Sequence, residues 1–320
     1  MYNPDPACVL PLAKFMKPKL VIILGPTAVG KSDVALELAA NVNAEIINAD
    51  SQQVYRRMDI GTGKPSTADR DRVLHHLIDI VEPDEEFNAA IFRRLALEKI
   101  DEIRNREKNE IVCGGTGLYL KALTRGLFSG SKQDPGIRGA LEAEIQTGGL
   151  SALYRRLEHL DPKATTWIHP HDRQRIIRAL EVYELTGKPM SAWQEEHSFR
   201  ESAFETLKVG LKRDRAELYE LINRRCERMI QEGLLEEVRG LVAKGYGLDL
   251  KPMQSVGYRH MGLVLQNKLT LEEALTLMQQ DTRHLAKRQM TWFRQDREIQ
   301  WFHPDTQRQR ITEAVEAFLS

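Results

Sequence analysis

The stretch Gly25-Pro26-Thr27-Ala28-Val29-Gly30-Lys31-Ser32 constrains the fold of this chain most, because it fits the pattern G-x-x-x-x-G-K-[ST]. The apolar run Leu20 to Leu24 precedes it, and helix-like apolar spacing follows from Val34 to Ala40. A strand, a glycine-rich turn and a helix in this order predict a loop whose backbone N–H groups hold a polyphosphate. Lys31 adds a positive charge, and the Ser32 hydroxyl can bind Mg²⁺. A glycine-rich turn without a phosphate role is the alternative, but the flanking segments favour the phosphate loop.

A second apolar run, Glu45 to Asn48, leads to Asp50. In a parallel sheet this carboxylate lies at the same edge as the phosphate loop, where open α/β sheets bind their ligands. Three roles fit this position: a ligand of Mg²⁺, a general base, or the N-cap of a helix that Gln52 and Tyr55 would open. Position alone does not choose among them.

Strand-like and helix-like segments alternate in the first part of the chain, which predicts an α/β fold with a mainly parallel sheet flanked by helices. The expected strands are Leu20 to Leu24, Glu45 to Asn48, Leu77 to Val81 and Ile111 to Cys113, and the expected helices are Val34 to Ala40, Ala89 to Arg104 and Leu118 to Thr124. A polar, glycine- and serine-containing stretch, Gly126 to Gln133, then suggests a boundary. Between Asp134 and Ser202 only helical spacing follows, which predicts a helical insertion domain.

We therefore predict four regions. Residues 1–17 form a flexible tail without an export signal, 18–130 the first part of the phosphate-loop core, 131–204 the helical insertion domain, and 205–320 the second part of the core. The last region is expected to contain a strand from Leu207 to Leu211, long helices through Arg215 to Lys244 and Leu271 to Arg294, and a final strand from Ile299 to Phe302.

Composition excludes several classes of protein. No stretch approaches 18 apolar residues, so no transmembrane helix is expected, and three scattered cysteines indicate neither a disulfide framework nor a zinc site. We expect a cytoplasmic protein. The 46 Lys+Arg balance the 46 Asp+Glu, so any nucleic-acid surface must come from segregated charge. Positive residues do cluster, although solvated helix faces would give the same pattern: Arg173, Arg175, Arg178; Arg213, Arg215, Arg224, Arg225, Arg228; Arg283, Lys287, Arg288, Arg294, Arg297.

Six further motifs follow the phosphate loop and Asp50 to Gln53. They are Met58-Asp59-Ile60-Gly61-Thr62-Gly63-Lys64-Pro65, His75-His76-Leu77-Ile78-Asp79, Gly114-Gly115-Thr116, Gln174-Arg175-Ile176-Ile177-Arg178-Ala179-Leu180-Glu181, Ser255-Val256-Gly257-Tyr258 and Lys287-Arg288-Gln289-Met290-Thr291-Trp292-Phe293-Arg294. Together these motifs resemble the tRNA dimethylallyltransferases, also called tRNA isopentenyltransferases, of the bacterial type. The matches appear in family order from about Lys19 to about Phe302, so the resemblance covers nearly the whole chain.

The resemblance implies transfer of a dimethylallyl group from its diphosphate to the exocyclic amino group of the adenosine 3′ of the tRNA anticodon. It makes Asp50 the general base and gives catalytic roles to Lys31, Arg225 and Thr116, with Mg²⁺ on Ser32. Arg225 would contact the diphosphate, with an exposed helix arginine as the alternative. Thr116 would contact tRNA, with a helix cap as the alternative.

The resemblance also assigns tRNA contacts around the anticodon stem-loop. Trp292 and Phe293 fit a base-stacking role or a core role, and Arg138 fits a tRNA contact or an exposed helix start. The implied tRNA-binding residues are Asp50, Ser51, Gln52, Gln53, Thr116, Arg138, Gln174, Arg175, Ile176, Ile177, Arg178, Lys287, Arg288, Gln289, Met290, Thr291, Trp292, Phe293 and Arg294.

Three rival functions share part of these features. A small-metabolite kinase would use the phosphate loop without the basic segments at 174–178 and 287–294. An adenylate dimethylallyltransferase would accept a free nucleotide and would not need the helical insertion. A non-enzymatic RNA-binding protein would leave the loop and Asp50 without a role. The sequence favours the tRNA enzyme, acting as a monomer with dimethylallyl diphosphate and tRNA as partners.

Overall fold

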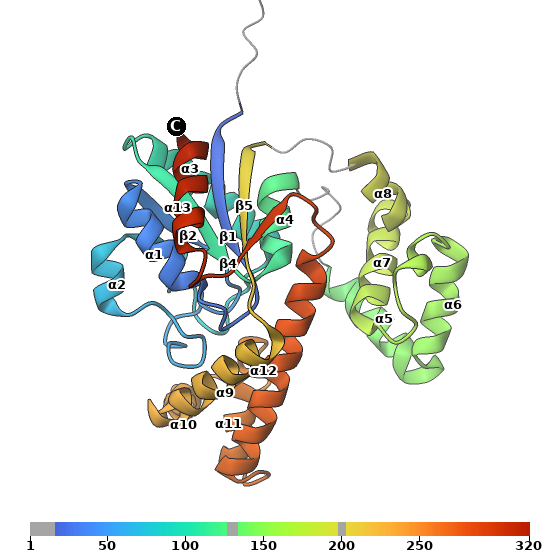
Figure 1. Cartoon of the computed structure of the whole chain (residues 1–320). Helices are drawn as coiled ribbons and strands as arrows, with labels where there is room; N and C mark the ends of the chain where they lie inside the picture. The colour runs from blue at the N-terminus through green and yellow to red at the C-terminus, as the bar shows by residue number, and fades with distance from the viewer. Residues whose placement is uncertain (1–16, 127–133, 198–202) are drawn as a thin grey trace, which may run out of the picture. The chain divides into compact units, whose positions relative to one another are not determined.

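The computed structural model describes residues 17–126, 134–197 and 203–320 (Figure 1). The chain divides into two compact units, one made of residues 1–124 and 203–320 and the other of residues 125–202. The predicted tail at 1–16, most of the predicted boundary at 126–133 and the end of the predicted insertion at 198–202 lie outside the described residues.

The first unit contains a six-stranded parallel sheet in the order β3-β2-β4-β1-β5-β6. The inner strands are runs of buried residues, as expected for strands covered on both faces. The predicted fold class is therefore confirmed. The strands are β1 (Lys19–Leu24), β2 (Ala44–Asn48), β3 (His75–His76), β4 (Asn109–Gly114), β5 (Glu205–Leu211) and β6 (Ile299–Phe302).

Helices cover both faces of the sheet. Helix α1 (Lys31–Asn41) and helix α13 (Arg308–Leu319) pack together on one face, and α3 (Ala89–Arg104) packs on β2 and β4 from the other. Right-handed crossovers require this, because the chain moves in opposite directions along the sheet through α1 and through α3. Helix α4 (Gly117–Arg125) follows β4, and the short α2 (Thr67–Arg72) precedes β3.

Four helices beyond β5 form a cluster at the edge where the strands end (Figure 1). They are α9 (Arg215–Gln231), α10 (Leu234–Ala243), α11 (Tyr258–Leu265) and α12 (Leu271–Phe293). Helix α12 packs against both α9 and α11. Its N-terminus is fixed by a capping box, in which Thr270 accepts from the amide of Glu273 while the Glu273 carboxylate accepts from the amide of Thr270.

Two local expectations in this unit are wrong. The strand expected at Leu77–Val81 is absent, because Leu77 and Asp79 have φ of 62° and 57°, which a continuous strand does not tolerate; Val81 only bridges to Tyr55. No helix follows Asp50, since residues 51–57 form turns and bends. The helices expected through 215–244 are present as α9 and α10, which are separated at Gly233.

The second unit is helical in its described part. It contains α5 (Pro135–Gly148), α6 (Leu150–Leu160), a short 3₁₀ turn (Ala164–Thr166), α7 (Arg173–Thr186) and α8 (Met190–His197). Asp134 caps α5 through the amide of Ile137, with Pro135 in the first turn. The helices enclose a core of their own that includes Leu153, Leu157 and Leu180.

Candidate active site

The phosphate loop connects β1 to α1 and has the backbone geometry of an anion cradle. Ala28 and Gly30 have φ of 63° and 102°, so the chain turns its amides toward one side. The Lys31 ammonium donates a hydrogen bond to the Pro26 carbonyl at 2.8 Å, across the loop. The described residues offer no acceptor to the amides of Gly30, Lys31 and Ser32. These amides therefore remain available to an anion at the N-terminus of α1.

Two partly buried cations face this loop. Burial lowers the pKa of Lys31 to about 8, with Cys113 and Asp50 acting against the shift and Arg225 adding to it. Burial also lowers the pKa of Arg225, which Asp50 opposes. Each cation is therefore held in a place that disfavours its charge. A multiply charged anion bound between them would reverse that cost, as expected of a diphosphate site.

Arg225 lies against a loop rather than in solvent, so the alternative of an exposed helix arginine is wrong. Its Nη2 donates to the carbonyl of Thr62 at 3.2 Å. A Cβ atom on Gly63 would lie 2.2 Å from the same nitrogen, so only glycine permits this approach. The loop from residue 58 to residue 64 thus fixes where the guanidinium of α9 sits.

Glu237 of α10 anchors this loop. Its carboxylate accepts hydrogen bonds from the amides of Asp59 (2.9 Å), Ile60 (2.7 Å) and Gly61 (3.1 Å), and from the hydroxyl of Tyr258 (2.5 Å). Burial of Tyr258 and the nearby Glu237 carboxylate raise the pKa of its hydroxyl well above the ordinary value, so it remains a donor. The sequence singles out the motif containing Tyr258 but gives no signal for Glu237, because its partners are backbone amides far away in the chain.

Asp50 lies at the end of β2, beside the phosphate loop. Its Oδ1 accepts from the amide of Gln52 at 2.8 Å, whereas Oδ2 accepts from none of the described residues. With no helix after it, the N-cap role is wrong. Thr116 Oγ1 accepts from the amide of Ser51 at 3.0 Å, which joins the end of β4 to the Asp50 loop. The Thr116 hydroxyl therefore supports Asp50 through the next residue of the loop, Ser51.

The two glutamines after Asp50 have different surroundings. Gln53 Nε2 donates to the carbonyls of Thr62 (3.3 Å) and Gly63 (3.0 Å), so this amide group holds the loop that positions Arg225. The N–H donors of Gln53, an implied tRNA-binding residue, are therefore engaged by the protein backbone. Gln52 Oε1 is buried without a hydrogen-bond partner among the described residues, and such an acceptor is free for a ligand.

Gln289 of α12 bridges two loops of the site. Its Oε1 accepts from the amide of Thr27 at 2.8 Å, and its Nε2 donates to the carbonyl of Gly115 at 2.9 Å. A Cβ atom on Gly115 would stand 2.4 Å from Nε2, so the glycine allows the helix to come this close. This predicted tRNA-contact residue thus uses its side-chain amide to join the phosphate loop to the end of β4.

The rest of the 287–294 segment divides between surface and interior. Lys287, Arg288, Thr291 and Arg294 are exposed, and Met290 is half-buried. Trp292 is 39% exposed and packs so closely on α4 that a Cβ atom on Gly117 would lie 2.2 Å from its indole ring. Phe293 is buried, so of the two roles considered for it the core role is the one observed.

The candidate tRNA residues of the second unit form their own network. Arg138 and Arg178 both hydrogen-bond to the fully buried carboxylate of Glu181, at 2.9 Å and 2.8 Å. Burial acts to raise the pKa of Glu181, but the two guanidinium hydrogen bonds hold it below its ordinary value. Gln174 and Arg175 are exposed, and Arg175 pairs with Asp172. Ile176 and Ile177 lie in the core of the unit, so direct tRNA contact by their side chains is wrong.

The model of the family described as IPP transferase matches residues 53–296 of this chain. The chain belongs to the IPP transferase family. The family that the motifs predict is thereby confirmed. This chain is 52% identical over 285 residues to "tRNA dimethylallyltransferase 2" of Geotalea uraniireducens, and the match covers 89% of this chain and 92% of that protein. It is also 52% identical to the tRNA dimethylallyltransferase of Geobacter metallireducens, with the same coverage of both chains.

Solved structures of tRNA isopentenyltransferases are also similar to this chain. A full-length tRNA isopentenylpyrophosphate transferase from Bacillus halodurans is similar with a TM-score of 0.70 at 40% identity, covering 95% of this chain and 97% of that one. A eukaryotic dimethylallyltransferase described as acting on tRNA is similar with a TM-score of 0.81 at 27% identity, covering 94% of this chain and 79% of that one. No described helix is both long and apolar enough to cross a membrane.

Proposed function

We propose that this protein transfers a dimethylallyl group from dimethylallyl diphosphate to the exocyclic amino group of the adenosine 3′-adjacent to the anticodon in tRNA, releasing diphosphate. Family membership supports the activity. The observation that carries it is the placement of two desolvated cations, Lys31 and Arg225, around the phosphate loop with Asp50 beside them.

The negative charge of the leaving group explains why the site holds two cations. A diphosphate carries about three negative charges, and cleavage of the allylic C–O bond adds charge to the bridging oxygen. Lys31, Arg225 and the first amides of α1 are fixed before the reaction, so they stabilise this developing charge without reorganising. In other enzymes this type of loop serves phosphoryl transfer. In this protein it would bind the diphosphate, which leaves as a whole.

Asp50 serves as the general base. An adenine amino group is a poor nucleophile because its lone pair is delocalised into the ring, so its proton must leave as the new C–N bond forms. Oδ1 accepts from the amide of Gln52, which leaves Oδ2 to accept that proton. Thr116 keeps the supporting loop in place through the amide of Ser51.

Mg²⁺ fits this site as an ion held mainly by the substrate. The described residues contain no group of three His, Cys, Asp or Glu side chains that could hold a metal. The Ser32 hydroxyl is exposed at the start of α1 and would supply one ligand, with diphosphate oxygens and water supplying the others. Bound there, Mg²⁺ would neutralise charge on the diphosphate.

The tRNA enters as acceptor through its anticodon stem-loop. The target base must leave its stack to reach Asp50, and the exposed Lys287 and Arg288 on α12 would hold the RNA backbone while it does so. Within the second unit, Arg138 and Arg178 are further candidate tRNA contacts. We expect a monomer that works in the cytoplasm, where its tRNA substrate is found.

The rival functions use less of the chain. A kinase would leave the basic segments at 174–178 and 287–294 without a ligand, and an adenylate dimethylallyltransferase would leave the exposed cations of α12 without a ligand. One assay separates them: protein, Mg²⁺ and labelled dimethylallyl diphosphate are offered AMP, ATP or unmodified tRNA. We expect label only in tRNA. Label in AMP, or stoichiometric phosphate release from ATP, would overturn the proposal.

A further inference from the structure

Two arginines surround one tyrosine ring where α9 and α12 pack against each other. The helices run antiparallel, since Arg283 meets Tyr219 and Asn223 while Gln279 meets Glu227. The guanidinium carbon of Arg215 lies 5.1 Å from the centre of the Tyr219 ring, and that of Arg283 lies 5.8 Å from it. Arg283 Nη1 also donates to Asn223 Oδ1 at 2.7 Å. One aromatic ring thus holds two guanidinium groups from two helices.

These arginines carry uncompensated charge. Neither Arg215 nor Arg283 forms an ion pair with any residue that the structure describes, whereas Arg224 on the same helix pairs with Glu220. The sequence of α12 also supplies few acidic partners, because no Asp or Glu occurs between Asp281 and Asp296. Lys287 stands one helical turn beyond Arg283, on the same side of α12 and exposed.

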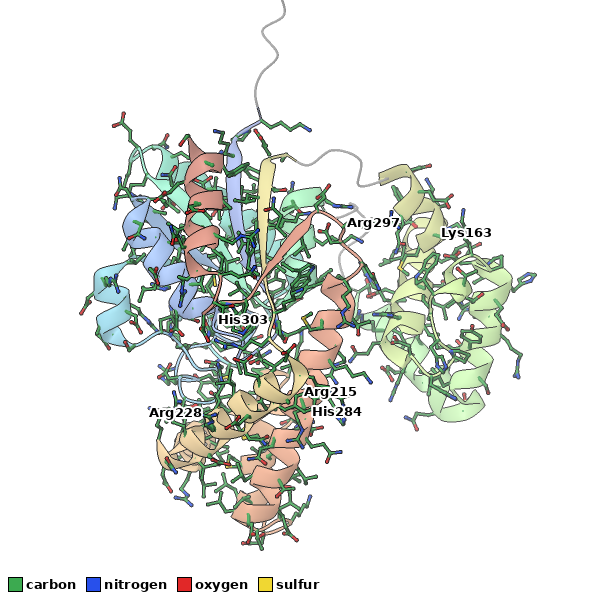
Figure 2. The ribbon with its side chains drawn as sticks, in the orientation of Figure 1. Lys163, Arg215, Arg228, His284, Arg297 and His303 are labelled. Atoms are coloured by element: carbon green, nitrogen blue, oxygen red, sulfur yellow. The ribbon has the colours of Figure 1, made fainter. Side chains whose placement is uncertain are left out.

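The four residues form one accessible surface. Arg215 and Lys287 are exposed, and Tyr219 and Arg283 are half-exposed. Figure 2 labels Arg215 next to His284, the neighbour of Arg283 on α12. We call the set Arg215, Tyr219, Arg283 and Lys287 the Tyr219 platform.

We propose that the Tyr219 platform binds the sugar–phosphate backbone of RNA. The inference rests on the proposed tRNA substrate and adds a contact surface to it that no predicted tRNA-binding segment contains apart from Lys287. A guanidinium stacked on a ring keeps its N–H fork ordered, and that fork matches two oxygens of one phosphate. Two such forks beside a lysine, none of them in an ion pair with a described residue, suit a row of phosphates rather than a single anion.

The exposed Arg288 follows Lys287 directly on α12, and the next residue, Gln289, contacts the phosphate loop. An RNA lying on the platform would therefore extend along the same helix that reaches the active site. Such a surface fixes the position of the tRNA without reading its sequence. The expected role is affinity, not discrimination among bases.

The test measures tRNA binding against salt concentration for the double variant Arg215→Ala/Arg283→Ala. We expect affinity to fall roughly five- to tenfold per lost phosphate contact near 0.1 M salt, and the slope of log affinity against log salt to flatten by about 0.7 to 0.9 per contact. Arg224→Ala is the matched control, because it removes an exposed arginine of α9 that is already paired with Glu220. It should leave both quantities unchanged.

Two more variants separate stacking from charge. Tyr219→Leu should weaken tRNA binding while keeping the salt slope, because the cations remain but are no longer ordered. Arg215→Lys/Arg283→Lys should likewise keep the slope and lose part of the affinity. Thermal unfolding and binding of inorganic diphosphate to the phosphate loop should match the unmodified protein in every case.

Unchanged tRNA affinity and slope in the double alanine variant would overturn the proposal, as would an equal loss in Arg224→Ala. Displacement by polyglutamate as effective as by an RNA stem of the same charge would show a site for acidic peptides and would also overturn it. Failure of the proposed function looks different, because the unmodified protein would then not prenylate tRNA at all.

Discussion

Replacement of Gln289 by alanine tests whether this side chain positions the phosphate loop or contacts tRNA. The change removes two hydrogen bonds, one to the amide of Thr27 and one to the carbonyl of Gly115. Each contributes about 0.5 to 1.5 kcal/mol. If the loop loses its position by that amount, diphosphate binding weakens by about 1 to 3 kcal/mol, which is roughly five- to 150-fold in Kd.

The assay is calorimetric titration with inorganic diphosphate and Mg²⁺, together with KM for dimethylallyl diphosphate at saturating tRNA. Gln289→Glu keeps the acceptor for Thr27 and loses the donor to Gly115, so its added negative charge beside the site should make it at least as defective. Gln280→Ala is the control, since it removes an exposed glutamine of the same helix. Unchanged diphosphate binding in Gln289→Ala, combined with weaker tRNA binding, would refute this reasoning and restore the tRNA contact.

Four further outcomes are expected. Asp50→Asn should keep both substrates bound while turnover falls by ~10²-fold or more, because an amide cannot accept the proton; near-normal single-turnover rates would remove Asp50 as the base. Because burial lowers the pKa of Lys31 to about 8, its ammonium is lost as pH rises through that value. Diphosphate affinity should therefore fall above about pH 8, with proton uptake on binding seen as a dependence of calorimetric heat on buffer, and Lys31→Arg should abolish the pH effect. Lys287→Ala/Arg288→Ala should weaken binding of all tRNAs alike and flatten the salt slope by about one unit per contact, and an unchanged slope would make this segment purely structural. Tyr258→Phe should lower the free energy of unfolding by about 1 kcal/mol, because the 58–64 loop loses part of its anchor, and should raise KM for dimethylallyl diphosphate. A loss of stability without a change in KM would show that this loop does not position Arg225 for the substrate.

The parts of the fold that follow local rules could be predicted from sequence. Buried parallel strands are continuous apolar runs, so β1, β2 and β4 are evident, and the phosphate loop is a local motif with its own strand and helix. The strand expected at Leu77–Val81 failed because two residues there adopt left-handed backbone conformations. Aspartate tolerates this conformation better than most residues, but leucine gives no sign of it, so the apolar run at Leu77–Val81 is indistinguishable from a strand in the sequence.

The site itself was predictable only as a set of residue types at one edge of the sheet. Position placed Asp50 near Lys31, but it could not decide among cap, base and metal ligand until the absence of a following helix excluded the cap. The sequence predicts tRNA contacts for Gln53 and Gln289. No local feature of a glutamine in such a segment tells whether its side chain contacts RNA or the backbone of the protein itself. Their partners lie 9 to 10 and 174 to 262 positions away in the chain. Such contacts exist only in the folded chain.

The supports of the site share one origin. Glu237, Arg225 and Gln289 all come from the helices after β5, yet each acts on a loop of the first part of the core. The phosphate motif alone therefore does not make a diphosphate site here, because the 58–64 loop and the phosphate loop take their positions from α9, α10 and α12. The same α12 presents Gln289 to the phosphate loop and Lys287 to solvent, so a tRNA held by the exposed side bears on the helix that holds the diphosphate loop. Binding of tRNA and placement of the diphosphate are then linked through one rigid element, and a substitution on the exposed side that changed diphosphate Kd only when tRNA is present would reveal that linkage.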